Sequence, residues 1–385
     1  MEQGKRAMDQ YQHLCRIAGK TWGINKNIRR LLYKTVIERT LCHGAAAWGH
    51  NMTSRLQKKL VSIQRLFLLC ITGAYMTTPT AALQVVTGLQ PFHLQIQQEE
   101  TYARVARARS SSNFFTVIFS PTDYESKSSG IHVHPPNFLF HSQISFAENH
   151  IDSGVKAIYT DGSKTDEGTG NAYCILENYG IIASWQGKFD RSNSVFQAEI
   201  LAIRMAIEAA SSLHRPIKIW TDSNECADQS AKEAITKNDP FLLPKPPSYL
   251  KAEIKSAALS IWQDNWNNGE TGRRTHDIVP RVSNKPVGWN REEIMFVTGH
   301  GPFPSYLLRF NLRTHDNCSC GGKGDPIHYA TKCPFTLSWH FQTPTVSLKL
   351  QWLKNILTNN FSRTRLRLLM RFICDENNLI VEDNN

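Results

Sequence analysis

The sequence predicts an α/β fold, in which helices pack on a mixed sheet, flanked by an N-terminal helical segment and a small zinc-type and helical C-terminal segment. Three observations support this prediction. Short apolar runs separated by turn residues follow one another from residue 156 to residue 189. An apolar stripe of helical period covers residues 198–209, and another short run, Ile217–Thr221, follows it. Three strands, a helix and a strand in this order are typical of a mixed sheet with a packed helix.

The first segment, residues 1–110, is expected to be helical and to carry all the excess positive charge. It holds 16 of the 44 Lys and Arg residues but only 5 of the 33 Asp and Glu residues. Leu60, Ile63 and Phe67 recur near helical spacing, and basic residues flank such stripes. This asymmetry favours a polyanion partner, most often nucleic acid. The alternative is a solvated helical surface.

Residues 111–154 are expected to form a linker, because serine clusters and prolines interrupt every period. No apolar run reaches the roughly 18–20 residues of a membrane span, and the N-terminus is too polar for a signal peptide. We therefore expect an intracellular protein, nuclear or cytoplasmic, that is neither secreted nor membrane-bound. The nine cysteines are expected to be reduced thiols, some of them metal ligands.

The segment 155–237 supplies the sheet. Turn-forming Gly, Asp and Asn residues separate its apolar runs. Ala198, Leu201, Ala202, Met205, Ala206 and Ala209 form the one-sided stripe of a helix. The expected strands are Lys156–Thr160, Gly170–Leu176, Ile181–Phe189 and Ile217–Thr221, and a second helix is expected at Ala227–Thr236.

Two further segments follow the sheet. Residues 250–340 are expected to contain an amphipathic helix, Lys251–Trp266, and then a cysteine- and histidine-rich module. Residues 346–376 are expected to end the fold with a pair of helices, within Leu348–Cys374.

Four acidic residues stand where the expected strands and helices place functional groups. Asp161 and Asp222 each end a strand, Glu199 lies at the edge of the buried face of the long helix, and Asp228 opens the next helix. Converging carboxylates repel one another unless cations neutralise them, and hard oxygen ligands suit Mg²⁺ or Mn²⁺. Two such ions can activate water and stabilise the leaving oxygen in phosphodiester cleavage. Taken singly, each acid has the alternative role of capping a turn or a helix.

Three short motifs carry a family resemblance. The runs Tyr159–Lys164, Gln197–Glu199 and Trp220–Ser223 resemble type 1 ribonuclease H, in the version found in jockey-like non-LTR retrotransposons of arthropods. The resemblance implies a five-stranded mixed sheet with helices. It also implies endonucleolytic cleavage of the RNA strand of an RNA–DNA hybrid by two divalent ions. Asp161, Glu199 and Asp222 would take the first three places of the acidic set.

The fourth acidic place departs from the family pattern. The run Asn224–Ala234 resembles the family's last-helix motif and assigns the fourth place to Asp228. The family has several dozen residues before this motif, with a helix, the fifth strand and a loop bearing a histidine. Here only five residues separate Asp222 from Asp228. We infer an internal shortening that leaves strand 217–221 at a sheet edge. The alternative to a ribonuclease is thus a catalytically inactive nucleic-acid-binding remnant.

A second constellation predicts a zinc site. Cys318, Cys320, His328 and Cys333 supply three thiolates and one imidazole, which is a tetrahedral Zn²⁺ set. The alternative is a group of buried reduced cysteines. The upstream runs Thr298–Phe303 and Tyr306–Phe310 resemble the stretch that precedes a Cys-Cys-His-Cys motif in the same family. The resemblance implies a structural zinc in a small domain that helps to hold the element's RNA, with His300 as a packing or hydrogen-bonding residue.

The N-terminal segment resembles the end of a reverse transcriptase region. Trp48-Gly49 after Ala45-Ala46-Ala47, together with the surrounding basic helices, carries this resemblance. The paired-aspartate strand motif of a polymerase is missing from the sequence, and we therefore expect no polymerase activity. The whole chain is interpreted as the C-terminal part of a retrotransposon polyprotein.

Overall fold

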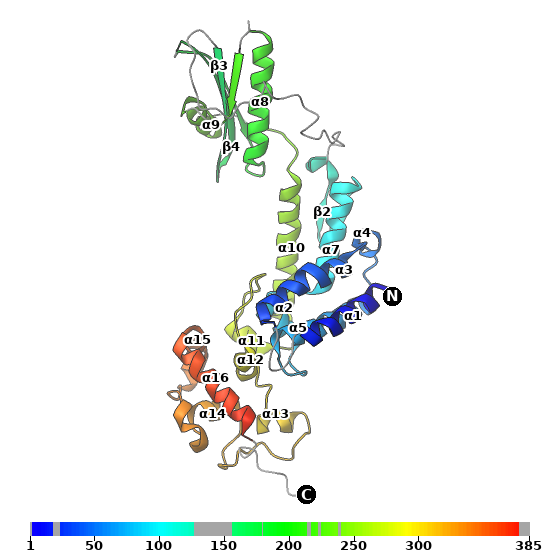
Figure 1. Ribbon diagram of the computed structural model, residues 1–385, viewed down its shortest axis with the longest axis vertical. Helices are drawn as coiled ribbons and strands as arrows, with labels where there is room; N and C mark the ends of the chain where they lie inside the picture. Colours follow the sequence, from blue (N-terminus) through cyan, green and yellow to red (C-terminus); the bar gives the residue numbers. More distant parts are fainter. Residues whose placement is uncertain are drawn as a thin grey trace. The chain divides into compact units, whose positions relative to one another are not determined.

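The computed structural model divides the chain into two compact units. One unit comprises Met1–Glu100 and Ser256–Asn385, and the other comprises Thr101–Lys255. Figure 1 follows both along the chain by colour. The residues described are 2–17, 24–126, 156–178, 180–213, 217–221, 225–237 and 240–376.

The first unit begins with helices that pack around α5. Thr53 caps the start of this helix by accepting a hydrogen bond from the Leu56 amide, and Gly73 ends it in the left-handed conformation, at φ +65°. The buried rings of Tyr33 and Phe67 form the centre of its core. The helices are α1 Glu2–Ile17, α2 Lys26–Leu32, η1 Tyr33–Ile37, α3 Glu38–Cys42, α4 Ala45–Trp48, α5 Ser54–Thr72, α6 Thr80–Thr87 and α7 Phe92–Tyr102.

The C-terminal residues complete the same unit. The Lys26 ammonium donates to Asn290 Oδ1 at 2.6 Å and to the Gly288 carbonyl at 2.9 Å. These contacts join segments more than 260 residues apart in the sequence. The elements are α10 Pro247–Asn268, which begins in the other unit, α11 Arg273–Ile278, α12 Arg291–Thr298, α13 Pro304–Arg309, α14 Pro326–Thr331, η5 Pro334–Trp339, η6 Val346–Leu348, α15 Lys349–Thr358 and α16 Asn360–Asp375.

The second unit is built on a mixed five-stranded sheet in the order β6-β3-β4-β5-β7. The neighbours β3–β4 and β4–β5 are antiparallel, whereas β6 runs parallel to β3 and β7 parallel to β5. The prediction of a mixed sheet with packed helices is confirmed. The elements are η2 Ala103–Arg107, β1 Ser112–Phe114, β2 Val117–Phe119, η3 Pro121–Asp123, β3 Lys156–Thr165, β4 Gly168–Glu177, β5 Gly180–Phe189, α8 Val195–Ser211, β6 Ile217–Thr221, α9 Glu225–Lys237 and β7 Pro240–Phe241.

Two helices cover the two faces of this sheet (Figure 1). Helix α8 packs through Ala206 against Ile158 of β3, and α9 packs through Ala227 against Tyr159 of the same strand. Since neighbouring strand residues point to opposite faces, the two helices lie on opposite sides. Helix α9 approaches so closely that a Cβ added at Gly170 would lie 1.9 Å from the Ala231 carbonyl oxygen.

Three details differ from the sequence prediction. Strand β3 does not end at Asp161 but continues to Thr165, and the chain turns only at Asp166 and Glu167. Part of the predicted linker, residues 112–119, forms the β1–β2 hairpin, which is stabilised by the buried side chains of Phe114 and Phe119. Strand β7 adds two residues to the sheet after α9. Most of the rest of the predicted linker lies outside the described residues.

Candidate active site and metal centre

Asp161 lies within β3, and the residues before and after it are paired with β4. Its register partner in β4 is the fully buried Ala172. The carboxylate oxygen Oδ1 accepts the Gly162 amide at 2.7 Å. A strand residue with paired neighbours has little backbone freedom, and therefore the side chain starts from a well-defined position.

Helix α8 brings Glu199 against β3 at Gly162. A capping box begins the helix, in which the Ser194 hydroxyl accepts the Gln197 amide and the Gln197 side chain accepts the Ser194 amide. A Cβ built on Gly162 would lie 3.0 Å from Glu199 Cγ and 3.1 Å from the Glu199 backbone nitrogen. The second acid thus packs directly against the residue that follows the first.

Asp222 lies outside the described residues. The described part of β6 ends at Thr221, which pairs in parallel register with Thr160. Strand β6 therefore ends level with the residue that precedes Asp161. Within the part of the chain that the structure describes, β6 is also the edge of the sheet.

Asp228 belongs to α9, on the sheet face opposite α8. Its Oδ2 forms an ion pair with the Lys232 ammonium one turn later, and its side chain is 42% exposed. An exposed i,i+4 pair of this kind stabilises a helix by only a few tenths of a kcal/mol, about 0.3–0.5. Hence Asp228 has a surface ion-pair partner of its own. By the alternation of β3, Asp161 lies on the same face as Tyr159, which α9 covers, whereas Glu199 packs from α8 against Gly162 on the other face.

The contact between α8 and Gly162 leads to a first prediction. Replacing Gly162 with alanine places a methyl group against Glu199, and we expect a loss of about 1–3 kcal/mol in the stability of the second unit. Gly180→Ala is the matched control, because its Cβ would find only the Glu177 carbonyl oxygen, at 3.5 Å. Urea unfolding followed by hydrogen exchange in β3 and α8 measures both. Equal stability of the two variants would contradict the packing described.

The predicted zinc ligands Cys318, Cys320, His328 and Cys333 come together. One ligand atom from each lies within 4.8 Å of all the others. The Cys320 Sγ to His328 Nε2 distance is 3.2 Å, and the Cys318 Sγ to Cys333 Sγ distance is 3.7 Å. Three sulfurs and one imidazole nitrogen in such a cluster fit a tetrahedral Zn²⁺ ion. The group could bind zinc.

A tight turn and a capped helix position these ligands. Gly321 has φ +85°, and a Cβ at Gly322 would lie 2.6 Å from the His328 ring. The Cys318 amide donates to the Gly322 carbonyl at 2.7 Å and so closes the turn. Asp325 caps α14 by accepting the His328 amide at 2.8 Å. The two glycines are therefore needed for the backbone to turn and for the imidazole to approach.

The electrostatics favour the ligating form of two groups. Burial lowers the pKa of His328, which keeps its imidazole neutral. Burial alone would raise the pKa of the Cys318 thiol, but the Cys320 amide and other hydrogen-bond donors outweigh it and lower that pKa. Metal-bound histidine is neutral and metal-bound cysteine is a thiolate.

His300 is a hydrogen-bonding residue, as expected from the sequence. Its Nδ1 lies 2.9 Å from the Thr77 hydroxyl, which also contacts the Tyr306 hydroxyl at 2.8 Å. Burial, followed by the charges of nearby arginines, lowers the pKa of His300 to about 4. A neutral His300 thus ties the chain before α13 to the loop before α6.

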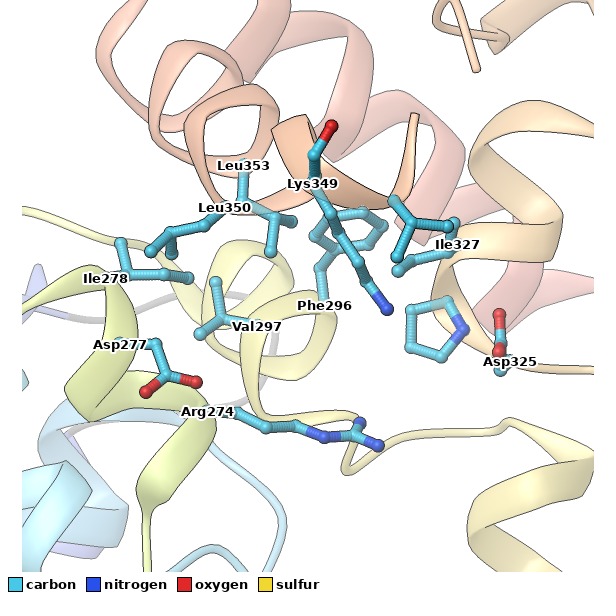
Figure 2. A pocket seen from close by; sticks show the side chains of 13 residues that line it. Arg274, Asp277, Ile278, Phe296, Val297, Asp325, Ile327, Lys349, Leu350 and Leu353 are labelled. Carbon is cyan, nitrogen blue, oxygen red and sulfur yellow. The ribbon is translucent and has the colours of Figure 1, made fainter. Parts of the chain in front are cut away.

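Sequence reasoning missed one hollow in the first unit. A cavity of about 380 Å³ is lined by residues of α11, α12, α14, η6 and α15, among them Arg274, Phe296, Ile327 and Lys349 (Figure 2). Its lining comes from segments up to about 80 residues apart and follows no motif. The only sequence signal near it is the run Thr298–Phe303, whose Gly299 contacts Arg274.

In the described ranges, no helix has both the length and the apolarity for a membrane crossing.

The chain is similar to Pol polyproteins of insect retrotransposons. A Pol polyprotein from the type-1 retrotransposable element R1 of Popillia japonica is 30% identical over 148 residues, which cover 37% of this chain and 57% of that protein. The corresponding polyprotein from element R1 3 of Nasonia vitripennis is 34% identical over 86 residues, 21% of this chain and 22% of that protein.

A third relative is a putative 115 kDa protein in the type-1 retrotransposable element R1DM of Drosophila melanogaster. It is 29% identical over 90 residues, 22% of this chain and 9% of that protein. The chain thus spans little more than half of the first of these relatives and less than a quarter of the other two. No protein-family profile and no solved structure matches the chain.

Proposed function

We propose that this relative of retrotransposon Pol polyproteins is an RNA–DNA hybrid ribonuclease that hydrolyses the RNA strand endonucleolytically with divalent cations. The observation that carries the proposal is the close packing of Glu199 against Gly162, the residue that follows Asp161 in β3. The sheet supports it as well, since β3, β4, β5, α8 and β6 follow one another in the order that the ribonuclease H resemblance implies.

The donor set at this place fits Mg²⁺ or Mn²⁺. Asp161 and Glu199 offer carboxylate oxygens, which are the ligands that such hard cations prefer. A Cβ at Gly162 would press on Glu199, and the glycine therefore lets α8 approach β3 closely. Bound divalent cations would supply activation of a water molecule and stabilisation of the leaving oxygen. In the proposal, Asp222 and Asp228 complete the acidic set.

The chain's own residues have three tasks in this proposal. The Gly162 amide holds the Asp161 carboxylate in place, and the capping box fixes where α8 begins and so where Glu199 points. Each carboxylate lowers the cost of holding cations beside a phosphodiester. The basic helices of the first unit and the zinc module are proposed to hold the hybrid and the element RNA through phosphate contacts.

A second candidate function is that of a nucleic-acid-binding remnant without catalysis. The ion pair between Asp228 and Lys232 favours it, because that carboxylate is held by a lysine on the exposed side of α9. The five-residue spacing between Asp222 and Asp228 favours it too. In this case the basic segment would retain affinity while the acidic set fails to hold the cations.

Cleavage of a labelled hybrid by the purified full chain in Mg²⁺ tests the proposal. We expect Asp161→Asn to lower the cleavage rate at least about 100-fold, as removal of one electrostatic stabiliser of a transition state does, and to leave hybrid binding in place. Asp228→Asn should lower the rate as well if Asp228 completes the acidic set. Asp166→Asn, in the β3–β4 turn, is the control that should cleave normally.

The outcomes separate the two candidates. Hybrid binding that weakens steeply with salt, without any cleavage by the unmodified chain, overturns the ribonuclease and supports the remnant. Cleavage that survives Asp161→Asn points to a contaminating nuclease and also overturns the proposal. An absence of hybrid binding rejects both candidates.

A further inference from the structure

We propose that the cavity between α11, α12, α14 and α15 binds one unpaired nucleotide, with the base inside the cavity and the phosphate at its cationic side. The site belongs to the first unit, whereas Asp161 and Glu199 belong to the second. The proposal rests on the proposed function only in taking a nucleotide as the ligand, and it concerns single strands where that function concerns hybrids.

The size and lining of the cavity suit a nucleobase. Its volume of about 380 Å³ falls in the range of small-molecule sites, roughly 300–1,000 Å³. Phe296 and Val297 of α12 form one wall, and Leu350 and Leu353 of α15 form another (Figure 2). Bases are held by apolar and aromatic surfaces because every base has a flat face that can stack.

Two cations mark where the phosphate would bind. Figure 2 shows that the charged ends of Arg274 and Lys349 point toward the side of the cavity where Asp325 lies. In the described part of the chain, neither side chain makes a hydrogen bond or an ion pair with another residue. A guanidinium with its donors uncommitted, beside an ammonium, is suited to the oxygens of a phosphate ester.

The backbone is shaped to hold Arg274 at this position. Gly299 has φ +68°, and a Cβ there would lie 2.3 Å from Arg274 Nη1. The glycine therefore both ends α12 and leaves the room that the guanidinium occupies. Burial, followed by the charge of the nearby Arg309, lowers the pKa of Arg274, although the charge of Asp325 acts in the opposite direction. This gives Gly299, in the run Thr298–Phe303, a physical role.

Two carboxylates complete the lining, and neither would prevent a base from binding. Asp325 accepts the His328 amide and caps α14. Asp277 lines the cavity from α11 and can accept the N–H groups of a base edge. Since the lining carries both signs of charge, a bare polyanion would be repelled in part, whereas a nucleotide offers N–H donors and a phosphate together.

Helix α14 links the cavity to the cysteine and histidine cluster. Ile327 lines the cavity, and the next residue, His328, points its Nε2 toward Cys320 Sγ. Two successive residues of one helical turn thus belong to the two sites. We therefore expect nucleotide binding to depend on zinc in the cluster.

Titration of the full chain with guanosine and adenosine 5′-monophosphates, and with fluorescent single-stranded RNA and DNA, tests the proposal. We expect Arg274→Gln with Lys349→Gln to weaken nucleotide binding about tenfold or more, because two charge-assisted contacts are lost. Leu350→Trp should weaken it similarly by filling the cavity while keeping both cations. Lys354→Gln removes the same charge from α15 outside the cavity and should leave binding unchanged.

Three results would overturn the proposal. The first is binding of ribose 5-phosphate as tight as that of the nucleotides, since the base would then contribute nothing. The second is unchanged nucleotide binding by Leu350→Trp, which would show that only surface charge attracts the ligand. The third is a loss of binding in Lys354→Gln as large as that in the double variant. Comparison of the affinities for single-stranded RNA and single-stranded DNA shows which nucleic acid the site prefers. Asp161→Asn serves as the reference, because it is expected to lose hybrid cleavage and to keep mononucleotide binding.

Discussion

Replacing Cys333 with serine is expected to abolish stoichiometric zinc binding and to open residues 316–333 to solvent. The Cys333 sulfur is fully buried and lies 4.0 Å from Cys320 Sγ and 3.7 Å from Cys318 Sγ. Loss of a structural metal belongs to the largest single-site effects, and we expect a local destabilisation of about 4 kcal/mol or more. Zinc released by acid, measured per chain, and hydrogen exchange of α14 report the result.

The loss of structure should remain local at first. The apolar core that the cysteine and histidine cluster shares with its neighbours should stay packed when the metal is lost. Cys318 and Cys333 pack in the same apolar cluster as Phe303, Leu366 and Met370, which hold α13 and α16. Chelation of the unmodified chain should open the same residues that Cys333→Ser opens. Cys374→Ser is the control, since this exposed thiol on α16 lies outside the cluster. An equal zinc content in the unmodified chain, Cys333→Ser and Cys374→Ser would rule the metal site out.

Replacing Glu293 with glutamine is expected to destabilise the first unit by about 3 kcal/mol. The Glu293 side chain is fully buried, and its Oε1 lies 2.8 Å from Arg363 Nε and 3.0 Å from Arg367 Nη2. The other oxygen accepts the Asn290 amide at 2.6 Å and caps α12. Glutamine keeps the size and the cap but leaves two guanidinium groups together without a counter-charge.

This contribution should depend on pH in a defined direction. Burial alone would raise the pKa of Glu293, but the hydrogen bonds from Arg363 and the Asn290 amide lower it below the ordinary value of 4.5. For a carboxyl group with a depressed pKa in the folded state, the stabilisation is complete above the unfolded pKa. It is lost as the pH falls through the folded pKa. The difference between the unmodified chain and Glu293→Gln should therefore be constant above about pH 4.5 and shrink below it.

The neighbouring residue offers a matched control. Glu292 forms its ion pair with Arg371 at 3.4 Å, and the Arg371 side chain is 64% exposed. An exposed pair is worth about 0–1 kcal/mol, and Glu292→Gln should thus change stability little at any pH. Hydrogen exchange of α12 and α16 amides in urea measures both variants. Equal losses at positions 292 and 293 would show that burial of the carboxylate is not what stabilises this contact.

Local sequence patterns determined the order of β3, β4, β5, α8, β6 and α9 in the second unit and the residues of the candidate metal centre. Alternation and apolar stripes depend only on residues a few positions apart, and they located the helix α8 and the strand β6. The four residues of the cluster lie within 16 residues of sequence, and their residue types, together with the resemblance of the runs before them, predicted one zinc site. The placement of Glu199 at the edge of the buried face of α8 followed from the same period.

The tertiary structure decided what depends on distant partners. Strand β3 runs past Asp161 because β4 supplies register partners as far as Gly168, although Gly162 and Ser163 look like turn residues. Glu293 meets Arg363 across 70 positions, and the cavity gathers Arg274 and Lys349 from two helices. Such contacts leave no periodic pattern in the sequence, because their free energy depends on two segments that are far apart along the chain. Sites made of residues close together in the sequence could be predicted. The ends of paired strands, the buried ion pairs and the cavity could be found only in the folded chain.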